Sequence, residues 1–255
     1  LVLLSCAKTM SAVSKVKVPL TTIPRFQKEE AEIALQMSQF SVDELERLLR
    51  VNAKIAVENY KRYQAFHAEA TPELPALLAY TGIVFKRLNP KDFSAEDFGY
   101  AQEHLRLTSF CYGLLRPLDV IRAYRLEGDV VLPELGNQTL FSYWRSRLTD
   151  TFIEDIRSAG GILCNLASDE MKSLFDWKRV ESEVRVVTPE FHVWKNGKLA
   201  TIVVYTKMSR GEMTRFILKN KIGNPEELKG FSWEGFEFDE SLSDERKLAF
   251  INGMG

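Results

Sequence analysis

The sequence predicts an α+β fold, an irregular mixed α/β arrangement in which helices pack on a central mixed sheet. Apolar runs of strand length and amphipathic runs of helix length both occur along the 255 residues. The two kinds of segment are mixed but do not follow a strict strand–helix–strand alternation. Hydrophobic residues make up 45% of the chain and charged residues 27%, as in an ordinary globular protein. We expect one compact domain over residues 1–255.

The first part of the chain predicts one strand and a helical hairpin. Residues 1–5 have the apolar character of a buried strand, and an amphipathic helix is expected within 26–40. Ser41 and Glu44 have the spacing of a capping box, which opens a helix. Asn52 can cap a second helix about two residues after the first one ends, so 42–66 should form a tight helical hairpin.

The remainder of the chain mixes both element types. Residues 74–80 fit either a helix or a buried strand, and later segments are more definite. Asn196-Gly197 is the dipeptide typical of a type I′ turn, which predicts a β-hairpin over 183–206. The other expected elements are a helix capped by Ser94, a helix over 139–157, a strand over 162–167, a helix over 209–220 and two strands in the tail.

The opening letters LVLLSC, residues 1–6, admit a second interpretation as the end of a lipoprotein signal. Such a signal needs a basic region and a longer apolar stretch ahead of the cysteine, and neither is present. We therefore expect a strand followed by a polar loop from Ser5 to Thr9. Elsewhere no apolar run approaches the about 20 residues that a transmembrane helix needs. A soluble protein without a membrane partner is expected.

Three scattered cysteines in apolar contexts favour reduced thiols and a cytoplasmic location. The three histidines share no metal-ligand spacing, so we expect no metal and no cofactor. The net charge of −1 argues against a wholly basic nucleic-acid binder, but it permits a local basic face.

Four stretches together resemble the YaaA family of bacterial proteins, and the resemblance runs from residue 1 to about Phe238. They are LVLLSCAKT at 1–9, HLRLTSFCYGLLRPLDVIRAYRLE at 104–127, NLASDE at 165–170 and YTKMSRGEMTRFI at 205–217. The resemblance implies a protein of the peroxide-stress response that helps to limit free iron and binds duplex DNA. It also implies a compact body with a basic cleft and a helix-hairpin-helix element.

Residues 42–66 are the stretch that looks like this helix-hairpin-helix element. The positions that match the family's second helix and its approach are Asn52, Lys54, Ile55, Ala56 and Asn59. Helix-hairpin-helix elements usually carry glycines in the hairpin, where bare backbone amides approach a phosphate. RVNAKIA, residues 50–56, has no glycine, so only helix-start amides near Asn52 are left for this role.

Basic side chains gather in three segments, which we expect to converge on one cleft. The residues singled out for DNA or phosphate binding are Lys8, Lys54, Arg62, Arg106, Arg116, Arg125, Lys207, Arg210 and Arg215. The bland alternatives are a solvated face for the hairpin and internal ion pairs to Asp119, Glu127 and Asp129 for the arginines of 106–125. Ser209-Arg-Gly211 is expected to lie at a strand-to-helix junction, where helix-start amides can bind a phosphate.

Small polar and acidic residues are expected to line the same cleft. Those singled out are Ser5, Thr9, Tyr112, Asn165 and Ser168. The last two lie where a buried strand meets a helix, which is where open α/β sheets usually place ligands. The alternative is that Ser168 caps the helix while Asp169 and Glu170 satisfy its dipole.

Two function hypotheses follow. The leading one is a non-enzymatic protein that binds duplex DNA with strong salt dependence and little sequence preference. The rival is an enzyme that acts on a nucleotide or another phosphorylated small molecule, with Lys8, Asp169 and Glu170 as candidate catalytic groups. An enclosed pocket would favour the second hypothesis, and a long open groove the first.

Overall fold

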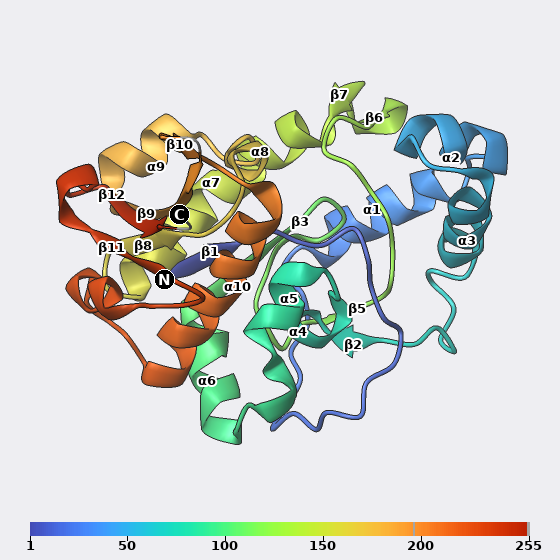
Figure 1. Cartoon of the computed structure of the whole chain (residues 1–255). Coiled ribbons are helices and arrows are strands. Elements are labelled where there is room, and N and C mark those ends of the chain that lie inside the picture. Colours follow the sequence, from blue (N-terminus) through green and yellow to red (C-terminus); the bar gives the residue numbers. More distant parts are fainter. Residues whose placement is uncertain (196, 254–255) are drawn as a thin grey trace.

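The central sheet is mixed, which confirms the predicted fold class. The computed structural model describes residues 1–195 and 197–253. Its strand order is β11-β12-β9-β8-β1-β3-β4, with β10 paired to β9 on one side (Figure 1). The strands are β1 (Val2–Leu4), β3 (Leu105–Ser109), β4 (Gly113–Leu115), β8 (Ile162–Asn165), β9 (Arg185–Lys195), β10 (Lys198–Ala200), β11 (Phe236–Asp239) and β12 (Lys247–Asn252).

β1 lies in the middle of the sheet because its residues Val2–Leu4 are apolar and fully buried. It pairs in parallel with β3 on one side and with β8 on the other. The parallel set continues through β9 to β12, while β4 and β11 are antiparallel to their neighbours. The carboxyl ends of β1, β3 and β8 therefore point to the same edge of the sheet.

The other elements of the described chain are helices, two short strand pairs and 3₁₀ turns. The helices are α1 (Gln27–Met37), α2 (Val42–Leu49), α3 (Ala53–Gln64), α4 (Ala76–Ala79), α5 (Ile83–Leu88), α6 (Ala95–His104), α7 (Leu140–Ser158), α8 (Asp169–Lys172), α9 (Trp177–Glu183) and α10 (Val203–Asn220). Two small antiparallel pairs are formed by β2 (Leu74–Pro75) with β5 (Val120–Ile121) and by β6 (Val131–Leu132) with β7 (Gln138–Thr139). Short 3₁₀ turns cover 90–92, 133–135, 225–230 and 240–242.

The two helices expected in 42–66 are confirmed, together with the signals that start them. The Ser41 and Glu44 side chains form a reciprocal capping box at α2, and the Asn52 side chain accepts from the Ile55 amide at α3. Figure 1 shows this pair at the opposite end of the molecule from β11 and β12. The Ser94 cap, the helix over 139–157 and the strand over 162–167 are confirmed as well.

The strand expected at the end of 183–206 is wrong beyond Ala200. β10 pairs with β9 over only three residues, and α10 begins at Val203 rather than near 209. Val203 and Val204 are exposed, so this apolar run fills no sheet position, and α10 instead packs on α5. Asn196 of the predicted type I′ turn lies outside the described residues. The ambiguous stretch 74–80 contains both a two-residue strand, β2, and a single helical turn, α4.

Candidate functional site

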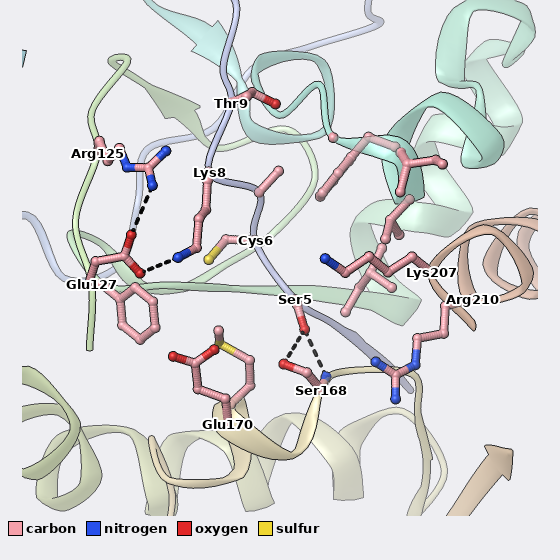
Figure 2. A pocket seen from close by; sticks show the side chains of 18 of the residues that line it. Ser5, Cys6, Lys8, Thr9, Arg125, Glu127, Ser168, Glu170, Lys207 and Arg210 are labelled. Carbon is pink, nitrogen blue, oxygen red and sulfur yellow. Dashed lines mark hydrogen bonds and ion pairs between the residues drawn. The ribbon is translucent and has the colours of Figure 1, made fainter. Parts of the chain in front are cut away.

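A pocket of about 320 Å³ lies at the carboxyl ends of β1 and β8. The chain leaves β1 through Ser5–Thr9 and leaves β8 through Leu166–Glu170, and both loops line it (Figure 2). The two strands are neighbours, while β3, the next strand of this sheet along the chain, pairs on the other side of β1. This is the switch point at which open parallel sheets bind their ligands. We call this hollow the strand-end pocket.

A pair of serines joins the two strand-end loops. The Ser168 amide donates to Ser5 Oγ over 2.9 Å, and the two hydroxyls lie 3.3 Å apart. Ser168 makes no side-chain cap on α8, which has only four residues, so the expected capping role of Ser168 is wrong. Its place is in the wall of the strand-end pocket.

Two cations of α10 line the pocket and have no ion-pair partner among the described residues. Lys207 and Arg210 are three residues apart, so they project from the same face of the helix. Among the described residues, Lys207 forms no ion pair, and its ammonium group points into the pocket in Figure 2. Arg210 Nε is buried and has no hydrogen-bond acceptor in the described chain. Burial lowers the pKa of Arg210, against the opposing effect of Asp169.

A buried carboxylate, Glu127, binds two of the basic side chains that line the pocket. Glu127 is only 4% exposed, and its two oxygens accept from Lys8 at 2.8 Å and from Arg125 at 3.3 Å. The Lys8 side chain is 64% exposed, so it lies at the mouth of the pocket while Glu127 lies deeper. Four cationic side chains and two carboxylates line the pocket in all, which leaves it with a net positive charge.

The floor of the pocket is apolar and holds an inert thiol. Burial raises the pKa of Cys6 to about 12, so the group stays protonated at neutral pH and is not an activated nucleophile. The buried side chains of the floor are Leu4, Phe85, Phe110, Leu126, Leu166 and Met171.

Several predicted residues fall outside this pocket, and each has an identifiable reason. Arg106 is buried, donates to Asp155 over 2.6 Å and also binds carbonyls at the end of α6. Arg116 pairs with Asp119, and Arg215 forms a bidentate pair with Asp92. The structure therefore does not bring these three arginines to the predicted cleft. The ion-pair alternative holds for Arg116 with Asp119 and for Arg125 with Glu127, whereas Asp129 pairs with Arg50.

The helical hairpin also stays apart from the pocket. Arg62 pairs with Glu58 one turn earlier on α3, and Lys54 is exposed on the same helix. Neither lines the strand-end pocket, so the structure does not join the hairpin to the other basic segments there.

Three of the predicted polar residues are placed elsewhere. Tyr112 is buried, and its hydroxyl accepts from the Arg122 amide. Asn165 is buried within β8, where its side-chain oxygen accepts from the Ala167 amide. Asp169 is exposed and pairs with Lys172 over 2.7 Å, which leaves Glu170 as the acidic residue of that loop that lines the pocket.

The expected phosphate seat at Ser209-Arg-Gly211 is wrong, because these residues lie within α10 and not at its start. Ser209 is buried, and a Cβ at Gly211 would meet the Val84 carbonyl oxygen. Gly211 thus allows α10 to approach α5, and the helix carries no open amides at this position.

A second hollow lies beside the pocket, and the sequence did not reveal it. It has a volume of about 870 Å³, and its lysines are Lys15, Lys17, Lys86 and Lys91. All four are exposed, none forms an ion pair within the described chain, and no acidic side chain lines the hollow. We call it the lysine groove.

The groove and the strand-end pocket share one wall. The Ser11 amide donates to the Ala79 carbonyl over 2.8 Å, and the Thr81 amide donates to the Thr9 carbonyl over 3.0 Å. These bonds hold the segment after β1 against the segment that leads into α5, and Phe85 of α5 lines both hollows.

The described residues hold no group of three or more His, Cys, Asp or Glu side chains placed to bind a metal ion. Nor does any helix in that part of the chain have the length and apolar character needed to cross a bilayer.

Comparison with known proteins agrees with the resemblance seen in the sequence. A family model described as "Peroxide stress protein YaaA" matches residues 1–242. A UPF0246 protein of Bacteroides thetaiotaomicron is 98% identical over 255 residues, which cover all of this chain and 99% of the relative. A UPF0246 protein of Crocosphaera subtropica is 37% identical over 252 residues, which are 98% of this chain and 99% of that protein. The chain therefore belongs to the peroxide stress protein YaaA family.

Proposed function

We propose that this protein acts in the cytoplasm during peroxide stress by binding duplex DNA, and that it helps to limit free iron. The observation that carries the DNA-binding part is the lysine groove, whose four exposed lysines have no carboxylate partner in the described chain. Lysine ammonium groups of this kind bind phosphates as point charges and carry no base preference.

The groove suits a phosphate backbone better than the cleft that the sequence suggested. Arg106, Arg116 and Arg215 would have to leave buried or bidentate acidic partners before they reached a phosphate. The groove lysines lose only water when a phosphate approaches, and counterions released from the DNA favour their binding.

A salt titration of duplex affinity tests this proposal. Contacts to four phosphates give a slope of log K against log salt of about −3.6, at about −0.9 for each phosphate. The double variant Lys15→Gln/Lys17→Gln should reduce the slope to about −1.8 and weaken binding to all sequences alike.

The matched control is Lys178→Gln/Lys198→Gln, which removes the same charge from exposed lysines outside the groove. This control should leave the slope within about 0.5 of the wild-type value. An affinity that does not depend on salt, or an equal loss in both double variants, would show that the groove is not the binding surface.

The iron part of the proposal has a separate test in cells that lack the gene and are exposed to hydrogen peroxide. Free iron measured by electron paramagnetic resonance should be high in these cells and should fall when the wild-type gene is returned. The Lys15→Gln/Lys17→Gln gene should fail to lower it. Equal rescue by both genes would separate the iron effect from DNA binding.

A second candidate function is an enzyme that acts on a nucleotide or another phosphorylated small molecule in the strand-end pocket. The buried Arg210 Nε has no acceptor among the described residues, and unpaired buried donors usually have a ligand or water as partner. The volume of about 320 Å³ falls within the range of small-molecule sites. Native mass spectrometry of the purified protein should show a phosphorylated compound that Arg210→Gln loses, and its absence from both would oppose this candidate.

A further inference from the structure

The strand-end pocket has charged side chains at its mouth and apolar side chains at its floor. Binding of a DNA phosphate backbone does not need the apolar floor. Lys207 and the mostly exposed Lys8 lie at the mouth of the pocket, and Arg210 stands beside them. Below them the floor is formed by buried apolar and aromatic side chains, Phe110 and Met171 among them. Such a site accepts a ligand with an anionic end and an apolar, ring-sized body.

A nucleotide has this division of chemistry. Its phosphate matches the ammonium of Lys207, which has no ion pair in the described chain, and the guanidinium of Arg210, whose buried Nε has no acceptor there. Its base has two apolar faces that contact aromatic and thioether side chains favourably, while its polar edge needs hydrogen-bonding groups. Ser5 and Glu170 supply such groups at the side of the pocket.

The lysine groove sets the direction from which a nucleotide would come. Phe85 lines both hollows, and the two segments that border the groove continue into the pocket wall. Gly82, Ile83 and Val84 of the pocket also lie between Thr81 and Lys86 of the groove. A strand whose phosphates lie along the groove would thus lie beside these pocket residues.

We propose that the strand-end pocket receives a single nucleotide, base first, extruded from a DNA strand that lies in the lysine groove. This inference rests on the proposed DNA binding and adds a recognition event to it. Lys207 and Arg210 hold a phosphate beside the extruded nucleotide, and Phe110 and Met171 contact its base. Unpairing a base costs a few kcal/mol and costs least at a mismatch, so the pocket gives the protein a preference for unpaired or mismatched positions.

The test compares a fully paired duplex with the same duplex that carries one central mismatch. The wild-type protein should bind the mismatched duplex about tenfold more tightly. Ile83→Trp fills the mouth from a half-exposed position at the start of α5 and changes no lysine. It should keep the affinity for paired duplex within about twofold and should lose the preference for the mismatch.

A second variant guards against misfolding of the first. Arg210→Gln leaves the pocket volume nearly unchanged, and it should weaken binding of the mismatched duplex about tenfold while the paired duplex changes little. Circular dichroism and thermal melting check that both variants fold as the wild type does.

Photo-crosslinking locates the base directly. A 5-iodouracil placed at the mismatch should crosslink to the peptide that contains Phe110 or Met171, as read by mass spectrometry, and Ile83→Trp should abolish this product. Equal affinity for paired and mismatched duplexes together with crosslinks confined to groove peptides would overturn the inference while leaving backbone binding intact. Failure to bind any duplex would overturn both proposals. Free mononucleotides that occupy the pocket without any mismatch preference in DNA would overturn the inference in favour of a small-molecule site.

Discussion

Two arginines show how surroundings decide the role of a single residue. Arg106 is 7% exposed, its Nε donates to Asp155 and its Nη1 donates to backbone carbonyls, so its charge is used inside the protein. Arg210 is partly exposed, and its buried Nε has no acceptor in the part of the chain that the structure describes, so its charge remains available to a ligand. The two residues look alike in a sequence, and only their partners tell them apart.

Removing Arg106 should therefore damage folding and not DNA binding. Burial by itself raises the pKa of Asp155, but Arg106 and Arg25 outweigh it and leave the pKa below its ordinary value. Arg106→Ala would leave this carboxylate buried with reduced compensation, at a cost of about 3 kcal/mol in unfolding free energy. Urea denaturation measures the cost, and the control Arg25→Ala, which removes an exposed partner of the same carboxylate, should cost less than about 1 kcal/mol. A similarly small loss of unfolding free energy in both variants would contradict the structural role given to Arg106.

Glu30 on α1 predicts a pH dependence of stability. Burial raises the pKa of Glu30 to about 7, Arg122 opposes this and Glu73 adds to it. The folded state therefore holds the proton more tightly than the unfolded state, so stability falls as pH rises from about 4.5 to about 7. Glutamine does not titrate, so Glu30→Gln should make the fall in unfolding free energy between these pH values smaller by about 1–2 kcal/mol. This figure allows for partial solvent screening of Glu30. Denaturation at pH 4.5 and pH 8 tests it, and an equal effect of the substitution at both values would refute it.

At the scale of elements, the contact between α5 and α10 positions both hollows. α5 contributes Phe85 to the pocket and the groove, while α10 contributes Lys207 and Arg210 to the pocket. Gly211 permits the approach, because a side chain there would meet the Val84 carbonyl of α5. The close packing of these helices is thus part of the site.

Two glycine substitutions with opposite expected effects test this packing. Alanine normally stabilises a helix interior by about 1 kcal/mol relative to glycine, and Gly99→Ala in α6 should do so because nothing lies within 4 Å of its Cβ position. Gly211→Ala should instead destabilise the protein by about 1–3 kcal/mol, because α5 must move to admit the methyl group. Thermal melting of the two variants measures both changes in stability. Stabilisation by both substitutions would show that α5 moves away from α10 at little cost.

Most of the secondary structure could be predicted because it depends on interactions between residues close in sequence, such as helix caps. The caps at Ser41, Asn52 and Ser94 act within three residues, so their geometry follows from the letters alone. The stretch LATIVVYT, 199–206, contains β-branched residues that favour strands, but β10 ends at Ala200 after three residues paired with β9, and α10 begins at Val203.

Charge partners were predictable only when they lay nearby in the sequence. The pair of Arg116 with Asp119 spans three residues, whereas Arg106 reaches Asp155 across 49 residues. The lysine groove is lined by residues of 11–17 and 77–93, which are far apart in the sequence, so no local pattern predicts it. These long-range partners are set by the order of strands, which periodicity does not specify.

For the whole molecule, DNA in the groove should stabilise the fold by mass action. A ligand that binds only the native state adds about 2.7 kcal/mol to unfolding free energy when its concentration is 100 times its dissociation constant. Duplex DNA should accordingly raise the melting temperature at low salt, and added salt should remove the increase. Lys15→Gln/Lys17→Gln should show a smaller increase than Lys178→Gln/Lys198→Gln. Equal shifts in the two double variants would place the DNA elsewhere.

The central position of β1 has a consequence for synthesis on the ribosome. Its partners are β3, about a hundred residues later, and β8, whose Cys164 pairs with Val2. At 5–20 residues per second, β1 waits roughly 10–30 s for its second neighbour to emerge. Through that interval the nascent chain exposes an apolar segment with unsatisfied backbone groups, which is the kind of segment that chaperones shield. Translation speed and chaperone supply should therefore affect the yield of this protein.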